Sequence, residues 1–86
     1  MPQMNIVDIE IKIREIISRD LEVNVARVED IASKRLDELF GLDSIAMLEL
    51  ILSIEKEFDL MVPVEDLTAE NFRSIKAIAE MVQRLI

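Results

Sequence analysis

The chain has 86 residues and a formal net charge of −8; 51% of its residues are hydrophobic, but only three are aromatic. This length suits a single domain, residues 1–86, and a core of aliphatic side chains favours helices packed on helices. The sequence contains no cysteine and no histidine, which excludes disulfide bonds, the usual zinc ligands, and nucleophilic sites of the Ser-His-Asp or Cys-His type.

The first predicted helix runs from about Asn5 to Arg19. Five isoleucines fall within one arc of roughly 100°, the width of a core-facing stripe, and Asn5 is a good N-cap. These isoleucines are Ile6, Ile9, Ile13, Ile16 and Ile17. Val7 and Ile11 lie off this arc, and we expect them to widen the buried face, the alternative being contact with a partner.

Residues 22–43 have no sustained hydrophobic period and many charges, which predicts a long connection with one helical turn near Leu36 to Phe40. Six apolar residues are expected to hold it across the bundle: Val23, Val28, Ile31, Leu36, Leu39 and Phe40. A connection of this length allows the next helix to run parallel to the first. Gly41 can take a positive φ just before that helix.

The second predicted helix, from Ser44 to Phe58, has two apolar faces. The core-facing residues are Met47, Leu50, Ile51, Ile54 and Phe58. Ile45, Leu48 and Leu52, here called the apolar strip, gather on a separate arc of about 60°. Because so small a domain has little core volume for a second face, the strip and the nearby Glu49 and Glu55 predict a docking surface. The alternative is that another segment of the same chain covers the strip.

Two further helices complete the predicted fold. Pro63 ends any earlier helix and favours a new start, which predicts a short third helix within residues 65–72. The fourth helix is predicted from Ser74, as N-cap, to about Leu85. Its apolar stripe consists of Ile75, Ile78, Ala79, Val82, Leu85 and Ile86. The expected fold is therefore all-α, a four-helix bundle with three long helices, a short third helix and a long first connection.

The Asp43-Ser44 pair at the start of the second helix is the candidate chemical site. Backbone N–H groups and the positive end of the helix dipole would favour a phosphate attached to Ser44. The alternative is that Asp43 or Ser44 merely caps the helix. A hydrolase pairing Ser44 with a lysine is a further possibility, but nothing in the sequence places a base or an oxyanion hole beside the hydroxyl.

The segment "GLDSIAMLELILSIEKEFDLMVP" resembles the acyl carrier protein and peptidyl carrier protein family. The family pattern is Gly-x-Asp-Ser-Leu, then an apolar-acidic-apolar triplet, then Glu-x-x-Phe. The matching residues are Gly41, Asp43, Ser44, Ile45, Leu48-Glu49-Leu50, and Glu55 to Phe58. Ile45 replaces the usual Leu and keeps an apolar contact beside Ser44. The resemblance implies a four-helix bundle of the acyl-carrier type.

The resemblance also implies a function. A phosphopantetheinyl transferase would use coenzyme A and Mg²⁺ to attach a 4′-phosphopantetheine arm to Ser44, flanked by Asp43 and Ile45. The chain would be a free-standing carrier and not an enzyme: a ligase or acyltransferase would load an acyl or aminoacyl thioester onto the arm, and downstream synthases or transferases would use it. The residues implied to meet these enzymes are Leu48, Glu49, Leu52 and Glu55.

Two residues that differ from those of many fatty-acid carriers indicate which kind of carrier the sequence resembles. Ala46 and Lys56 stand where many fatty-acid carriers have acids, and the C-terminal segment resembles dedicated carriers, including aminoacyl carriers of the D-alanyl type and those of polyketide or nonribosomal peptide pathways. The remaining alternative is an unmodified acidic helical adaptor that binds a basic partner.

The charge distribution and the N-terminus indicate a location and a class of partner. Residues 22–59 hold ten acidic and four basic side chains, and so six of the eight net negative charges, which disfavours nucleic acid and anionic membranes and favours basic partners. The N-terminus lacks the pattern of a signal peptide, and no apolar run reaches the ~18 residues of a membrane span. We expect a cytoplasmic protein.

Overall fold

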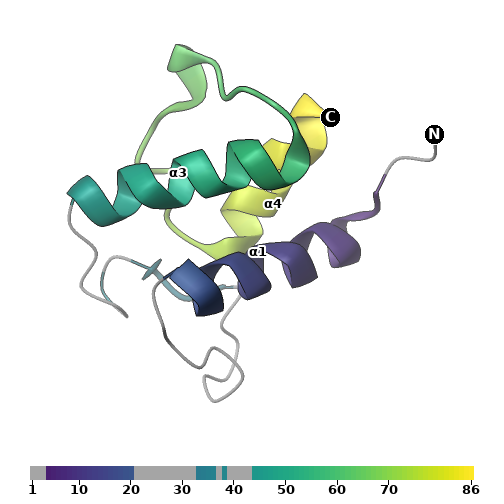
Figure 1. Cartoon of the computed structure of the whole chain (residues 1–86), viewed down its shortest axis with the longest axis horizontal. Helices are drawn as coiled ribbons and strands as arrows, with labels where there is room; N and C mark the ends of the chain where they lie inside the picture. The colour runs from purple at the N-terminus through teal and green to yellow at the C-terminus, as the bar shows by residue number, and fades with distance from the viewer. Residues whose placement is uncertain (1–3, 21–32, 37, 39–43) are drawn as a thin grey trace.

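The computed structural model describes residues 4–20, 33–36, 38 and 44–86. These residues form the helices α1 (Ile6–Asp20), α3 (Ser44–Phe58) and α4 (Ile75–Leu85) and the 3₁₀ turn η3 (Val64–Asp66), as Figure 1 shows. Within the described ranges the fold is helical and contains no strand, which confirms the all-α class. The predictions for Gly41, Asp43 and most of the first connection lie outside these ranges.

The structure confirms the predicted N-cap of α1 and most of its predicted buried face. The Asp8 backbone N–H donates to Asn5 Oδ1 at 2.9 Å, so Asn5 is the expected N-cap. Four of the five predicted isoleucines are fully buried: Ile9, Ile13, Ile16 and Ile17. The expectation for Val7 and Ile11 is wrong, because their side chains are 57% and 47% exposed. The isoleucine arc alone fills the space facing the other helices.

The core is built where α1 packs against both α3 and α4. Leu50 and Ile54 of α3 are fully buried, while the other predicted core residues of that helix are partly buried against them. In α4 the Ser74 hydroxyl accepts a hydrogen bond from Ala77 N at 3.1 Å, which confirms the predicted cap. The buried residues of α4 are Ile75, Ile78, Ala79, Met81 and Val82. Met81 was not predicted, and Ile86, which was, is 37% exposed.

Among the described residues of the first connection, Leu36 ties the connection to this core. Leu36 is fully buried, as expected of a residue that holds the connection across the bundle. Its backbone N–H donates to the Arg73 carbonyl at 2.7 Å, just before α4.

The predicted parallel course of α1 and α3 is wrong. Two side-chain pairs connect the helices: Lys12 Nζ with Glu57 Oε1 at 3.8 Å, and Ser53 Oγ, which donates to Asp20 Oδ2. From the first pair to the second, the residue number rises from 12 to 20 in α1 and falls from 57 to 53 in α3. The two helices are therefore antiparallel, as Figure 1 also shows. The length of the connection permitted either direction, and the packing and polar contacts between the two helices decide it.

The predicted third helix within residues 65–72 is also wrong. Its place is taken by η3, which follows Pro63, and by turns up to Arg73. The Thr68 hydroxyl accepts a hydrogen bond from Asn71 N at 3.2 Å, and the Phe72 N–H donates to Ala69 O at 3.3 Å. A side-chain bond such as that of Thr68 competes with α-helical bonding and favours a chain of short turns.

The longest helices of the described residues have 15 residues, and none has the length and apolarity needed to span a membrane.

Candidate functional site at the start of α3

Ser44 is the first residue of α3, as the sequence predicted. The backbone N–H groups of a first helical turn have no partner within the helix, and the helix dipole makes this end positive. The first turn of α3 carries no acidic side chain. An anion attached to Ser44 would therefore meet favourable charge from the backbone and no repulsion from side chains of that turn.

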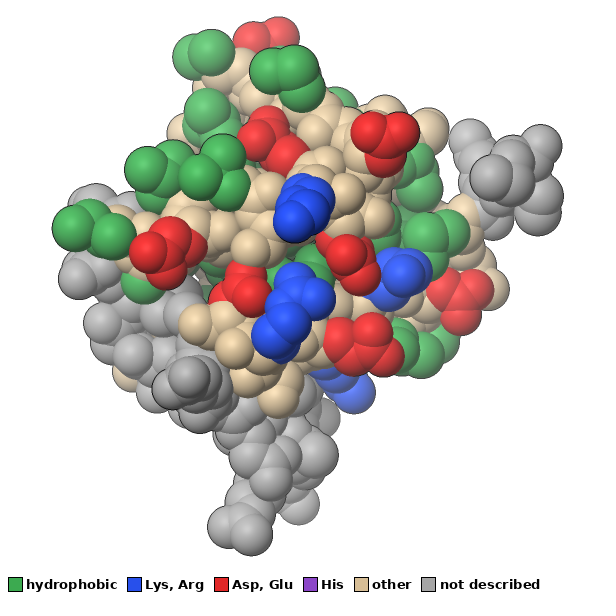
Figure 2. All heavy atoms as spheres, in the orientation of Figure 1, with side chains coloured by type: hydrophobic (Ala, Val, Ile, Leu, Met, Phe, Trp, Pro, Cys, Tyr) green, Lys and Arg blue, Asp and Glu red, His purple; other side chains and the backbone are tan. Residues whose placement is uncertain are grey.

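The apolar strip lies on the exposed side of α3. Ile45 is 70% exposed, and Leu48 and Leu52 are each 56% exposed. Among the described residues, no segment covers the strip at these exposures. Figure 2 shows hydrophobic side chains at the surface around the N-terminal part of α3. A large apolar side chain thus follows Ser44 directly, and two more follow along the same helix.

The acidic residues near the strip differ in what they contact. Glu49 is exposed to solvent. Glu55 is half-buried, and its Oε2 accepts a hydrogen bond from Val62 N at 2.8 Å. Both were predicted to meet partners, but Glu55 also anchors the chain that follows α3.

Sequence reasoning missed a second group of exposed apolar side chains. Residues 59–67, here called the apolar loop, connect the end of α3 to the turns before α4. Met61 is 84% exposed, Val64 82% and Leu67 45%. The signal available in the sequence was "LMVPVEDL", an apolar segment that Pro63 keeps out of a helix, so its side chains need not face a core.

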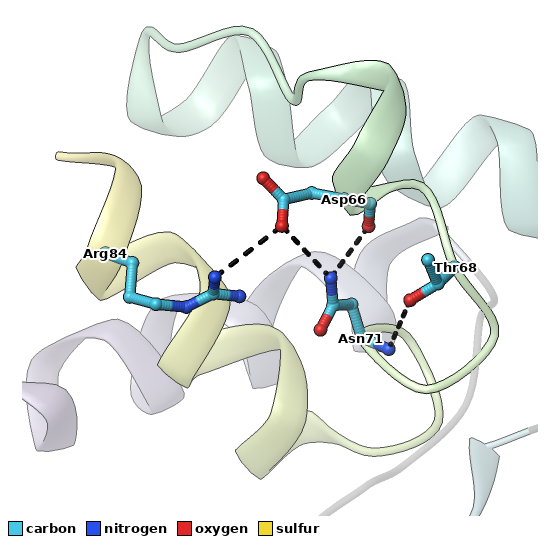
Figure 3. Close-up of polar contacts among 4 residues, drawn as sticks. All are labelled: Asp66, Thr68, Asn71 and Arg84. Carbon is cyan, nitrogen blue, oxygen red and sulfur yellow. Dashed lines mark hydrogen bonds and ion pairs between the residues drawn. The ribbon is translucent and has the colours of Figure 1, made fainter.

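A polar cluster, here called the Asp66 cluster, holds the far end of the apolar loop (Figure 3). Asn71 Nδ2 donates to the Asp66 backbone carbonyl at 2.9 Å and to Asp66 Oδ1 at 3.4 Å. Arg84 Nη1, near the end of α4, lies 3.5 Å from the same Oδ1. The cluster therefore ties η3 to both the following turn and α4.

Comparisons with known proteins agree with this fold. Residues 12–82 match the family model described as phosphopantetheine attachment site. The chain is 34% identical over 76 residues to aminoacyl carrier protein 2 of Bradyrhizobium diazoefficiens, covering 88% of this chain and 84% of that protein. It is 36% identical over 73 residues to an acyl carrier protein of Bdellovibrio bacteriovorus, covering 85% of this chain and 88% of that one.

A solved structure matches as well. It is the crystal structure of Bradyrhizobium japonicum glycine:[carrier protein] ligase complexed with glycylated carrier protein. The TM-score is 0.70 at 30% identity, and the match covers 84% of this chain and 95% of the matched chain.

The helical fold and these matches define the class: the chain is a carrier protein. It belongs to the phosphopantetheine attachment site family, and the cofactor of that family is 4′-phosphopantetheine.

Proposed function

We propose that Ser44 bears the 4′-phosphopantetheine arm and that the chain presents acyl or aminoacyl groups on that arm to partner enzymes. The observation that carries the proposal is the position of Ser44, which opens α3 beside the exposed apolar strip in a chain whose residues 12–82 match the family. The bound arm would supply a thiol, which the chain lacks because it has no cysteine.

The residues around Ser44 fit a phosphate-linked group. The first turn of α3 lies at the positive end of the helix dipole and contains no acidic side chain, so this turn favours the phosphodiester of the arm. The side chain of Ile45 is mostly exposed and gives an enzyme that acts at Ser44 an apolar contact one residue away.

The enzymes proposed as partners would bind along α3. Leu48 and Leu52 would supply apolar contacts, and the exposed Glu49 would favour a basic surface on the enzyme. The proposed partners are a phosphopantetheinyl transferase, a loading ligase or acyltransferase, and downstream synthases or transferases. A cytoplasmic location would give access to coenzyme A.

Among possible cargoes, an amino acid has specific support. Two relatives are aminoacyl carrier proteins of Bradyrhizobium diazoefficiens, and the matched crystal structure contains a glycylated carrier protein and its ligase. Relatives named acyl carrier protein, however, have similar identities. The aminoacyl carrier is therefore the narrower proposal within the general carrier function.

The attachment site can be tested by mass. The purified chain is incubated with coenzyme A, Mg²⁺ and a broad-specificity phosphopantetheinyl transferase, and the intact protein is weighed. We expect the mass to rise by one arm, Ser44→Ala to abolish the gain, and the control Ser33→Ala, at an exposed residue outside α3, to keep it. No gain, or a gain that survives Ser44→Ala, contradicts the proposal.

The same samples separate the other interpretations. An unmodified adaptor would bind its partner equally well after Ser44→Ala. A hydrolase would turn over an activated ester before any arm is attached.

The cargo needs a separate experiment. The arm-bearing chain is incubated with ATP, glycine and a glycine:[carrier protein] ligase, or with ATP, a fatty acid and an acyl-loading ligase. Formation of a hydroxylamine-sensitive glycyl adduct supports the aminoacyl carrier, whereas acylation alone favours an acyl carrier. Neither result changes the assignment of Ser44.

A further inference from the structure

The apolar loop presents two of the most exposed large hydrophobic side chains in the described part of the chain. Met61 is 84% and Val64 82% exposed, more than any residue of the apolar strip. In Figure 1 the loop leaves the C-terminal end of α3 and runs back in the direction of the N-terminal end, where Ser44 lies. Figure 2 shows hydrophobic side chains over this part of the surface, above α3.

Side chains from two helices fix this loop at both ends. Near its start, the Glu55 carboxylate of α3 accepts the Val62 N–H at 2.8 Å. Near its end, Asp66 contacts Arg84 of α4 at 3.5 Å and Asn71 of the following turn at 3.4 Å. Val62 of the loop is buried in the core, whereas Met61 and Val64 stay in solvent, so the same anchors that fix Val62 also hold these two exposed side chains in one arrangement.

The charges around the loop indicate what could bind there. Asp59, Glu65 and Glu70 are exposed acidic residues of the loop and of the turn that follows it. An apolar surface with an acidic rim fits an enzyme surface that is apolar and bordered by Lys or Arg side chains. Any enzyme that modifies Ser44 must cover the start of α3, toward which the loop runs.

We propose that Asp66, Asn71 and Arg84 are positioning residues: they hold Met61 and Val64 for contact with the phosphopantetheinyl transferase that modifies Ser44. This inference rests on the proposed function and adds a second contact area, away from the apolar strip. The three residues do not touch the reacting atoms. They act by keeping the apolar loop in its binding arrangement before the enzyme arrives, which lowers the ordering cost of association.

The test is the steady-state rate of arm transfer, with the full chain as the varied substrate and coenzyme A and Mg²⁺ in excess. We expect Arg84→Met to raise KM about fivefold and to leave kcat within about twofold, because binding weakens while the reacting groups are unchanged. Arg84→Lys keeps the charge that faces Asp66 and should recover most of the loss. The matched control is Arg14→Met, at an exposed arginine of α1.

A second variant tests the surface directly. Met61→Ser with Val64→Ser removes the exposed apolar contacts and should raise KM by a similar factor. Adding Arg84→Met to this pair should have little further effect, because both changes act through the same contact. Circular dichroism and thermal melts check that each variant is folded, and the Met61 and Val64 changes lie at exposed positions outside the core.

Each outcome has a distinct meaning. A wild-type KM for either Arg84→Met or the Met61/Val64 pair, in a chain that still receives the arm, overturns the inference and leaves the proposed function standing. A wild-type chain that receives no arm defeats the proposed function itself. An equal rise in KM for Arg14→Met shows that the loss is not specific to the Asp66 cluster, and this also overturns the inference.

Discussion

Asp59, the residue directly after α3, has a φ of 52°, in the left-handed region. The Leu60 N–H donates to the Glu55 carbonyl at 3.0 Å, the bond that closes a Schellman-type helix end. Glycine is the usual residue at such a position because it has no Cβ, and aspartate tolerates it better than most other residues do. The end of α3 therefore carries a small conformational cost.

This cost can be measured. We expect Asp59→Gly to raise the free energy of unfolding by about 0.5–1 kcal/mol, from urea denaturation followed by circular dichroism. Asp59→Asn is the control, because it removes the charge and keeps a side chain that tolerates a positive φ. If Asp59→Asn stabilises as much as Asp59→Gly, relief of charge repulsion and not backbone conformation is the cause.

Leu48 and Leu50 lie two positions apart on α3 but on different faces. Leu50 is fully buried, whereas Leu48 is 56% exposed. We expect Leu50→Ala to cost about 2–5 kcal/mol of stability and Leu48→Ala less than about 0.5 kcal/mol, measured by thermal and urea denaturation. Leu48→Ala should instead slow arm transfer. Equal destabilisation by the two changes would show that the assignment of the faces is wrong.

Glu49 and Glu55 show how far single residues can be understood from sequence. Helical periodicity places both beside the apolar strip, and this much was predictable. The hydrogen bond from Val62 N to Glu55 depends on how the apolar loop turns after the helix, and no local pattern encodes that turn. The same holds for the contact between Asp66 and Arg84, which are 18 positions apart and meet only in the folded chain.

At the scale of elements, the long helices were predictable because their apolar residues repeat with the helical period. The caps Asn5 and Ser74 also fixed where α1 and α4 begin. The short third helix was not predictable in this way: Thr68 and Asn71 favour turns, and too few residues lie between Pro63 and Ser74 for a period to emerge. Helix direction also escaped prediction, because the position of an apolar stripe shows which face of a helix is buried and does not show which way the partner helix runs.

The contact between Ser53 and Asp20 tests the antiparallel pairing of α3 and α1. Ser53 Oγ donates to Asp20 Oδ2 across the two helices, and both residues are half-buried. We expect a double-mutant cycle of Ser53→Ala and Asp20→Ala, followed by urea denaturation, to give a coupling energy of about 0.5–1.5 kcal/mol. Ser33→Ala paired with Asp20→Ala serves as the control. A coupling energy near zero for Ser53 and Asp20 would mean that this contact contributes nothing to helix pairing.

For the molecule as a whole, the net charge of −8 and the exposed apolar groups act together. The core is built from buried residues of α1, α3 and α4 together with Leu36, Val62 and Phe72. The apolar strip and the exposed side chains of the apolar loop remain at the surface beside acidic residues. Charge of one sign speeds the approach of basic enzymes over distances up to about one Debye length, and apolar contacts then hold the complex. The fold thus separates stability, which comes from the buried faces, from recognition.

This separation predicts how partner association depends on salt. Glu49→Lys changes the net charge by two units at an exposed position of α3, whereas Glu80→Lys makes the same change at an exposed position of α4. In stopped-flow measurements with the phosphopantetheinyl transferase, we expect Glu49→Lys to lower the association rate about three- to tenfold at low salt, with the difference shrinking toward 0.5 M salt as screening increases. Glu80→Lys should have a clearly smaller effect, because it leaves the charge around the apolar strip unchanged. Equal slowing by both variants would mean that the association rate depends only on the net charge of the chain. This result would contradict the proposal that the enzyme recognises α3.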